Sequence, residues 1–287
     1  MNDRVEVRKT YKLFIGGAFP RSESGRTYEV HDTDDKFLAN AAKASRKDGR
    51  DAVLAARKGF AAWSSATAYN RGQVLYRVAE VMEGRRDQFI SDVQAAEGLG
   101  VKKSARVVDS AIDRLVWYAG WADKYAQVLG NTNPVAGPYF NFSIPEPTGV
   151  VAAVAPQDSS LLGLVSVIAP IVVTGNSLIV IASTKCPIPA ITLTEVLATA
   201  DVPAGVINVL TGDPAEITPW LASHGDVNSI DLTGVTSQDL AKQLEIEAAG
   251  TIKRVRRPAQ PDWLATPDLG RLASFVEIKT VWHPIGA

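Results

Sequence analysis

The stretch LLGLVSVIAPIVVTGNSLIVIA, residues Leu161–Ala182, decides the fold class of this chain. It carries no charged residue and is long enough to cross a membrane as a helix. However, the four residues TGNS at 174–177 divide it into an apolar block and a short run rich in Ile and Val. Because a polar turn rarely lies in the middle of a membrane-spanning helix, we expect a buried helix, a turn and a buried parallel strand instead.

Strands and helices alternate on both sides of this stretch. Strands are predicted at Val150–Val154, Leu178–Ala182, Val206–Leu210, Ser229–Leu232 and Ile252–Val255. Helices are predicted between them, at 161–173, 191–200, 214–223 and 237–249. This alternation predicts an α/β fold in which a Rossmann-like parallel sheet is covered by helices on both faces. The fold class alone assigns no function.

The residues before the sheet predict a short hairpin and three helices. The hairpin is expected at Tyr11–Phe19, and Ser45 with Asp48 forms the pattern of a capping box that begins a helix ending near Trp63. Further helices are expected at 71–83 and 108–129, the second because apolar residues recur at alternating spacings of three and four. We interpret Trp117 and Trp121, on the side of that helix, as the edge of the core, with a contact between subunits as the alternative.

Two further segments predict a hairpin arm and a separate strand. Residues 131–146 hold Gly137-Pro138 between β-prone flanks, which is typical of a hairpin arm. Phe275–His283 alternates and predicts a strand whose more apolar face carries Val276, Ile278, Thr280 and Trp282. We divide the chain into a nucleotide-binding-type domain, residues 1–130 and 147–260, and an arm and tail, residues 131–146 and 272–287, to which the family resemblance described below gives a role in oligomerisation.

Composition excludes several classes of function. A net charge of −1 gives no general attraction to nucleic acid or to an anionic membrane, and we interpret the basic run at 253–257 as a solvated strand end. The first twelve residues lack the apolar run of a signal peptide, and a single cysteine is in keeping with a reducing cytoplasm. His31, His224 and His283 are too scattered to predict a metal site.

Several short motifs occur in the order found in NAD(P)-dependent aldehyde dehydrogenases. They are YAGWADK at 118–124, EPTGV at 146–150, GNS at 175–177, VPAGVIN at 202–208 and LTG at 232–234. Together they cover about residues 10–255, and residues 274–286 resemble the last strand of that family. The resemblance implies that residues 256–273 stand where the family places a whole catalytic domain. The chain is thus also similar to the second, degenerate module of two-module fusions in that family.

The same resemblance implies that the catalytic positions are lost. The cysteine nucleophile belongs to the absent domain, and we interpret Cys186 as a small buried residue because no base lies near it in sequence. The position of the asparagine that donates to the oxyanion reads Asp158, whose carboxylate donates no hydrogen bond. The position of the glutamate general base reads Pro258.

The positions that bind the cofactor in this family are also altered. The lysine and glutamate that hold the adenosine ribose read Ile181 and Thr184. Thr233 and Gly234 remain from the turn that binds the pyrophosphate, and they are weak candidates for binding NAD. Next to that turn Val235 replaces a hydroxyl, and Asp239 places a carboxylate where it would repel a phosphate. We expect no cofactor, with weak NAD binding as the alternative.

The function implied is that of a pseudoenzyme, a non-catalytic aldehyde-dehydrogenase-like subunit in the cytoplasm. It would form a hetero-oligomer with a full-length aldehyde dehydrogenase homologue through the arm at 131–146 and the tail at Phe275–His283. One alternative is a divergent NAD-dependent aldehyde dehydrogenase with residual oxidoreductase activity. Another is a regulatory module that binds a dinucleotide.

Overall fold

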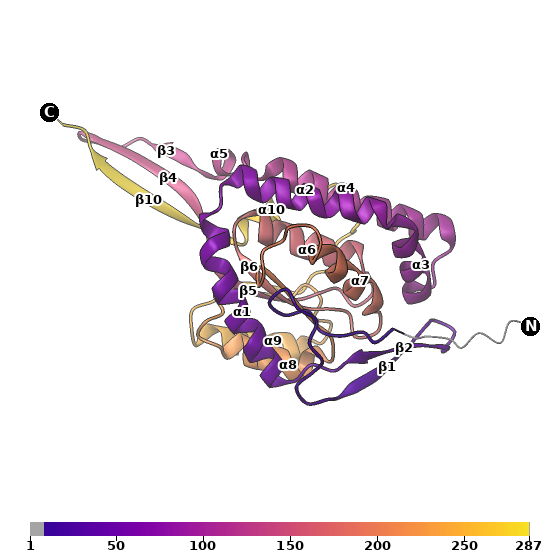
Figure 1. The fold of residues 1–287 in the computed structure, drawn as a ribbon. Helices are drawn as coiled ribbons and strands as arrows, with labels where there is room; N and C mark the ends of the chain where they lie inside the picture. Colours follow the sequence, from indigo (N-terminus) through magenta and orange to yellow (C-terminus); the bar gives the residue numbers. More distant parts are fainter. Residues whose placement is uncertain (1–8, 287) are drawn as a thin grey trace, which may run out of the picture.

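A five-stranded parallel sheet forms the centre of the molecule in the computed structural model, which describes residues 9–286 (Figure 1). Its strand order is β7-β6-β5-β8-β9, and every neighbouring pair is parallel. The strands are β5 Val150–Val154, β6 Ser177–Ile181, β7 Ile207–Leu210, β8 Ser229–Asp231 and β9 Arg254–Arg256. The chain therefore starts the sheet at its centre, builds outward to β7, and then returns to the other side of β5. The predicted Rossmann-like architecture is confirmed.

Helices cover both faces of the sheet, each over its own apolar core (Figure 1). On one face lie α6 Leu162–Val173 and α7 Ile188–Leu197, with α2 Ala68–Gly84, α3 Arg86–Glu97 and α4 Val101–Trp121 packed outside them. On the other face lie α1 Arg46–Ser65, α8 Pro214–Ser223 and α9 Gln238–Ala249. This two-sided cover explains why the central strands are uninterrupted apolar runs.

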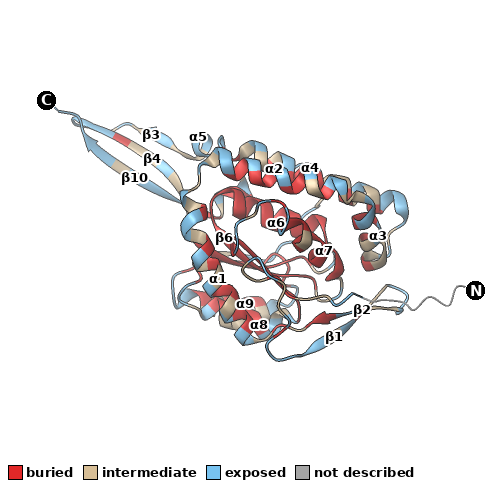
Figure 2. Ribbon diagram, viewed as in Figure 1, coloured by how far each residue is buried: buried red, intermediate tan, exposed pale blue. Residues whose placement is uncertain are grey.

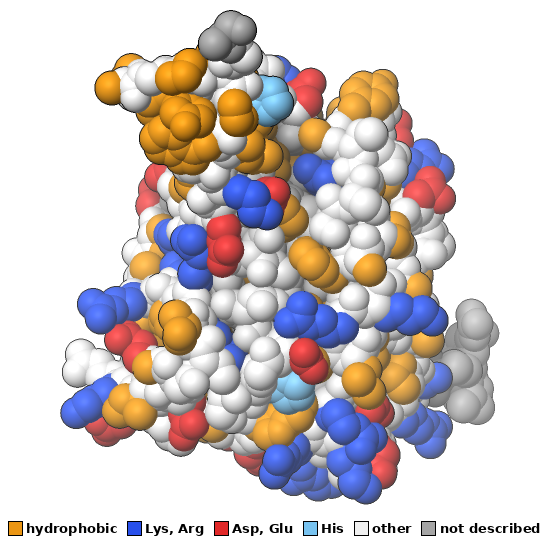
Figure 3. Space-filling model, turned by 90° about the vertical axis from the view of Figure 1, so that its left-hand side faces the viewer, with side chains coloured by type: hydrophobic (Ala, Val, Ile, Leu, Met, Phe, Trp, Pro, Cys, Tyr) orange, Lys and Arg blue, Asp and Glu red, His pale blue; other side chains and the backbone are white. Residues whose placement is uncertain are grey.

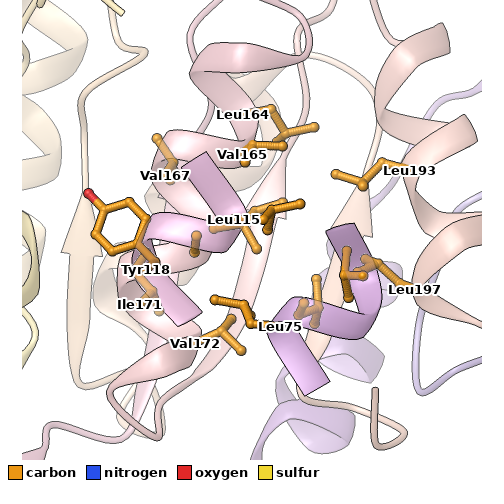
Figure 4. Close-up of a cluster of buried hydrophobic side chains, with 14 of the residues drawn as sticks. Leu75, Leu115, Tyr118, Leu164, Val165, Val167, Ile171, Val172, Leu193 and Leu197 are labelled. Carbon is orange, nitrogen blue, oxygen red and sulfur yellow. The ribbon is translucent and has the colours of Figure 1, made fainter. Parts of the chain in front are cut away.

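The charge-free stretch at 161–182 folds as α6, a turn and β6. All twelve residues of α6 are buried, because the helix lies between the sheet and the outer layer of α2 and α4. Figure 4 shows Leu75 of α2 and Leu115 of α4 packed against Ile171 and Val172 of α6. Each such side chain contributes roughly 1.5–3 kcal/mol by leaving water. Within the described residues, no helix combines the length and hydropathy needed to span a membrane.

Two predictions in the helical layer have different outcomes. The capping box at Ser45 and Asp48 is confirmed, with both reciprocal hydrogen bonds present at the start of α1. The single helix predicted at 108–129 is wrong, because α4 ends at Trp121 and a separate turn, α5 Tyr125–Leu129, follows. Backbone bonds from Ala122 to Ala119 and from Lys124 to Trp121 tighten the chain there and replace the α-helical pattern.

Trp117 and Trp121 lie at the edge of the core, as predicted. Their rings are 5.6 Å apart, and both pack against the cluster under α2, α4 and α6.

The expected turn of the first hairpin is present as a bridge between Ile15 and Ala18. The larger hairpin of β1 Thr27–His31 and β2 Phe37–Ala42 was not predicted.

A three-stranded antiparallel sheet projects from the body (Figure 1). It contains β3 Asn131–Asn133, β4 Tyr139–Pro147 and β10 Val276–Pro284, in the order β10-β4-β3. We call these three strands the arm. Figure 2 shows it as mostly exposed, in contrast to the buried central sheet. The predicted hairpin and tail strand are both present, and they pair in one sheet.

The root of the arm is fixed to the body at Phe275. Its side chain is 1% exposed and belongs to the core under α4 and α6, together with Leu272 of α10 Gly270–Ala273. Its backbone oxygen accepts hydrogen bonds from Asn176 Nδ2 at 2.8 Å and from Thr148 Oγ1 at 2.9 Å. The buried Asn176 also accepts from the backbone of Gly149 at 2.8 Å, so one amide ties β5, β6 and the arm together.

Candidate functional site: the carboxyl edge of the parallel sheet

The topology places one candidate site at the carboxyl ends of β5 and β8. The chain leaves β5 toward β6 and later returns on its other side as β8, so the loops after these two strands diverge. In sheets of this kind, ligands bind in the crevice at such a point of divergence. The loop after β8 begins at Leu232, and the loop after β5 begins at Ala155.

These two loops are in close contact at Gly234. A Cβ atom on Gly234 would lie 1.9 Å from the backbone oxygen of Ala155, so only glycine fits there. The Gly234 amide also donates to the backbone oxygen of Val154 at 3.0 Å. Packing between the two loops is therefore sufficient to require this glycine, which the sequence presented as a candidate for cofactor binding.

Thr233 lies beside it, and its hydroxyl is fully engaged. The hydroxyl and the amide of Thr233 both donate to the Asp231 carboxylate, the amide at 2.8 Å. Arg271 Nη2 donates to the Thr233 hydroxyl at 3.1 Å and to Asp231 Oδ2 at 2.9 Å. Asp231 is 0% exposed and Arg271 8% exposed, so the pair is a buried salt bridge. Thr233 has no hydrogen left to offer a ligand.

Arg271 comes from the connection between β9 and β10, residues 257–275. Its guanidinium lies 5.5 Å from the centre of the Trp263 ring in the same connection. Burial lowers the pKa of Arg271, the charge of Asp231 raises it, and nearby Arg256 lowers it further. Arg114 of α4 holds the connection from the other side, because it donates to the backbone oxygens of Trp263 and Ala265 at 2.6 and 2.9 Å. The connection is thus anchored over the end of β8.

Gln157 joins the loop that follows β5 to the loop that follows β6. Its amide oxygen accepts from the backbone of Thr184 at 2.9 Å, and its backbone oxygen accepts from Ser183 Oγ at 2.7 Å. The hydroxyl of Thr184 donates to the backbone oxygen of Gly212 at 2.8 Å, so it stabilises the loop after β7. Asp158 follows Gln157 and is exposed. Its carboxylate accepts no hydrogen bond from the residues that the structure describes.

Cys186 lies beside a half-buried carboxylate that the sequence did not reveal. Glu97, at the end of α3, accepts from the backbone and hydroxyl of Ser160 at 2.7 and 2.6 Å. Burial raises the pKa of Glu97, the Ser160 bonds lower it, and the charge of Asp158 raises it. The thiol of Cys186 donates to the backbone oxygen of Ala96 at 2.8 Å, and burial followed by the charge of Glu97 raises its pKa. This environment opposes thiolate formation.

The remaining candidate positions do not converge on a site. Ile181 is fully buried at the end of β6, and Pro258 is exposed just beyond β9. Asp239 is exposed in the first turn of α9, where Ser237 caps the helix by accepting from the Leu240 amide. Val235 is buried in the core under α8 and α9. In the described part of the chain, no three His, Cys, Asp or Glu side chains are grouped so as to hold a metal ion.

Comparison with known proteins assigns the chain to a family. Residues 19–257 match the aldehyde dehydrogenase family over most of the chain. This chain belongs to that family. Two similar relatives of this aldehyde dehydrogenase-type chain are retinal dehydrogenase 2 of Gallus gallus, 34% identical over 262 residues, and cytosolic aldehyde dehydrogenase 1 of Elephantulus edwardii, 32% identical over 260 residues. Each alignment covers 88% of this chain, but 48% and 50% of the relatives.

Solved aldehyde dehydrogenase structures share the fold. The NAD⁺ complex of aldehyde dehydrogenase from Bacillus cereus has a TM-score of 0.80 at 25% identity and covers 86% of this chain and 50% of that one. Betaine aldehyde dehydrogenase from Staphylococcus aureus, at 24% identity and a TM-score of 0.80, supports the fold alone. The chain thus spans about half the length of the relatives it matches.

Proposed function

We propose that this member of the aldehyde dehydrogenase family is a non-catalytic subunit that assembles in the cytoplasm with a full-length family member. The observation that carries the proposal is the arm, which is folded as a sheet, anchored to the body and largely exposed. β10 pairs with β4 over nine residues, from Val276 opposite Pro147 to Pro284 opposite Tyr139. A sheet of this length with apolar side chains on both faces is unfavourable in water unless another protein covers it.

Exposed apolar side chains occupy both faces of the arm. On one face Trp282 is 56% exposed and Ile278 51% exposed, and the Tyr139 ring lies 5.7 Å from that of Trp282. The other face carries Phe140 and Ile144, also exposed. Figure 3 looks onto this end of the molecule, where hydrophobic side chains gather over the arm. Such a patch, rich in aromatic residues, is typical of a protein interface.

The outer edge of β10 adds a second mode of contact. β10 is the terminal strand of the arm sheet and pairs only with β4 among the described residues. Its other backbone edge can therefore accept a strand from a neighbouring sheet. The short connection at 257–275 supports a role for a partner, because it leaves little chain in which to build a site beside β9. The partner's catalytic domain would supply the sheet that this arm extends.

The carboxyl edge of the sheet supports the absence of catalysis. A cysteine nucleophile must be a thiolate, whereas burial and Glu97 raise the pKa of Cys186. Asp158 offers a charge of the wrong sign for an oxyanion. The residues at the cofactor positions also fit a dinucleotide poorly, because Ile181 has no polar atom and the hydroxyls of Thr184 and Thr233 are committed to Gly212 and to Asp231. We derive no step through NAD.

Purification of the tagged full chain from its own source tests the proposal. We expect a full-length aldehyde dehydrogenase homologue to co-purify, and the complex to be lost when Ile278→Ser and Trp282→Ser are combined. A matched control combines Ile246→Ser and Ile252→Ser, which remove two exposed apolar side chains from the body and should leave the complex intact. A wild-type chain that purifies without any homologue would overturn the proposal.

An assay for aldehyde-dependent NADH formation separates this role from residual catalysis. The proposal predicts no activity from the isolated chain above the background of a preparation lacking it. Activity that disappears in Cys186→Ser would instead assign the chain as a divergent NAD-dependent aldehyde dehydrogenase. Activity that persists in Cys186→Ser would also contradict the proposal, and would place the chemistry elsewhere.

A further inference from the structure

A hollow of about 280 Å³ lies between the N-terminal segment and the β1–β2 hairpin, away from the arm and beside the loop after β7, where Thr211 Oγ1 donates to the backbone oxygen of Ala42. Its walls come from residues 10–12, residues 21–27 and β2. Tyr11 pairs with Ala41 of β2, and the Lys43 amide donates to the backbone oxygen of Arg26, so the walls are joined through the backbone. The volume suits a small metabolite of a few heavy atoms and is too small for a dinucleotide.

The lining of this hollow is basic. Lys12 contributes to it from residues 10–12 and both Arg21 and Arg26 from residues 21–27, and the ten described lining residues include no carboxylate. Within residues 9–286, neither Lys12 nor Arg21 has an ion-pair or hydrogen-bond partner. Two unpartnered cations that line one small space repel each other unless an anion lies between them.

The carboxylates nearest in the chain are engaged elsewhere, apart from Glu29, which lies opposite Asn40 in the hairpin and 3.6 Å from His31 Nε2. Asp48 is buried and accepts from Ser22 Oγ, from the Glu23 amide and from both the amide and hydroxyl of Ser45. Glu23 pairs with Lys47 at 2.6 Å. Glu216 pairs with Lys43 and, at a long 3.3 Å, with Arg26. The charges of Lys12 and Arg21 are therefore not paired within the described chain.

Neutral donors and an open wall complete the site. Thr27 and Asn40 also line the hollow and carry a hydroxyl and an amide, whereas the Ser22 hydroxyl already donates to Asp48. Gly25, at a φ of +70°, forms the turn between Ser22 and Thr27, and a Cβ atom on it would meet nothing within 4 Å. Arg26 is held by two long contacts, from Nε to Ser24 Oγ at 3.4 Å and from Nη2 to Glu216 Oε2 at 3.3 Å.

We propose that this hollow binds a small phosphate-bearing anion, either free phosphate or a low-molecular-weight phosphomonoester. Arginine and lysine are the side chains that recognise phosphate oxygens, arginine through paired N–H donors and lysine as a point charge. Hydroxyl and amide groups at the rim satisfy the remaining oxygens. The site is independent of the arm, so it does not rest on the proposed assembly.

Calorimetry on the full chain tests anion binding at the hollow with two probes, inorganic phosphate and glycerol 3-phosphate, at fixed ionic strength. We expect one site per chain, and Arg21→Gln or Lys12→Gln should each weaken binding by about tenfold or more, as loss of a charge-assisted contact does. Equal affinities would assign free phosphate, and tighter binding of the ester would assign an organic ligand. Both results support the site.

Arg77→Gln is the matched control. Arg77 is an exposed arginine on α2 that pairs with Glu80, so its loss changes the net charge by the same amount away from the hollow. Circular dichroism and melting curves should show that all three variants are folded, since each replaced side chain lies at the surface. The proposal is wrong if neither probe binds the wild-type chain, or if Arg77→Gln weakens binding as much as Arg21→Gln.

Discussion

Arg271 and Asp231 form a buried ion pair, 2.9 Å from Nη2 to Oδ2, that joins two parts of the chain forty residues apart. Asp231 ends β8, and Arg271 lies on the short helix α10. The pair closes the end of β8 with a residue from the connection. Because it is buried with a hydroxyl between its members, it links the order of the connection to the order of the sheet.

Removing Arg271 should destabilise the fold strongly. Arg271→Ala leaves the Asp231 carboxylate buried without its cation, which costs about 3–5 kcal/mol. Urea unfolding followed by circular dichroism measures the loss. Adding Asp231→Asn to Arg271→Ala should recover part of it, because the uncompensated charge is removed. Arg77→Ala, which breaks an exposed pair, should change the free energy of unfolding by less than about 1 kcal/mol; an equal effect of the two single variants would refute this role.

Gly234 should tolerate no side chain. A Cβ atom there would lie 1.9 Å from the Ala155 backbone oxygen, so Gly234→Ala must move one of the two loops. We expect a loss of stability on the order of 3 kcal/mol. Gly225→Ala provides the comparison, because nothing lies within 4 Å of the added atom. Melting temperatures of the two variants that agree within error would contradict the close approach of the loops.

Glu97 should make stability depend on pH. The pKa of its carboxyl is raised by burial in the folded state, so the folded chain holds this proton at higher pH than the unfolded chain does. The contribution of Glu97 to stability therefore falls as pH rises from its unfolded pKa through its raised folded pKa, and the cost persists above that window. Glu97→Gln should lack this fall while its amide oxygen still accepts from Ser160. The difference between wild-type and variant melting temperatures across pH 4–8 gives the measurement.

Cys186 should react slowly with thiol reagents. Burial and the charge of Glu97 raise its pKa, so little thiolate is present near neutral pH. Its rate with a disulfide reagent at pH 7.5 should be lower than that of a free cysteine peptide. Glu97→Gln should raise that rate by removing the neighbouring charge. Labelling as fast as the peptide would show that the thiol is neither buried nor opposed by a carboxylate.

The tail should divide into an anchoring part and an exposed part. Phe275→Ala removes a side chain that is 1% exposed in the core and should cost about 3–5 kcal/mol. Trp282→Ala removes a side chain that is 56% exposed and should leave the stability of the isolated chain within about 1 kcal/mol. Unfolding curves of the two variants test this division. A large loss for Trp282→Ala would mean that the arm is part of the core.

The sequence predicted the elements whose signals are local. The charge-free stretch at 161–182 identified α6 and β6, and Ser45 with Asp48 identified the start of α1. The β1–β2 hairpin was missed because its turn depends on Asp35 at a φ of +61° and on Asp32, which accepts from the Asp34 amide. The strand predicted at 252–255 begins two residues later, since Ile252 adopts a φ of +56° in the preceding turn.

The candidate site was predictable only where the family motifs reach. Motif order indicated Asp158, Thr233 and Gly234, and the structure puts all three in the loops that follow β5 and β8. The motif order gave no sign of Arg271 or Glu97. Their partners lie 40 and 63 residues away in sequence, and no local spacing encodes a contact at such separation. The packing role of Gly234 could not be predicted from the sequence either, because it depends on the position of another loop.

The anchorage of Phe275 has a consequence for how a partner would be met. Three segments hold its backbone oxygen and its ring, so the direction in which the arm leaves the body is set in the isolated chain. A protein that binds the arm then loses little further conformational freedom at this joint, and less of the binding energy is spent on ordering it. The arm is thus preorganised for binding, and the angle between the two bound proteins is determined in the unbound chain.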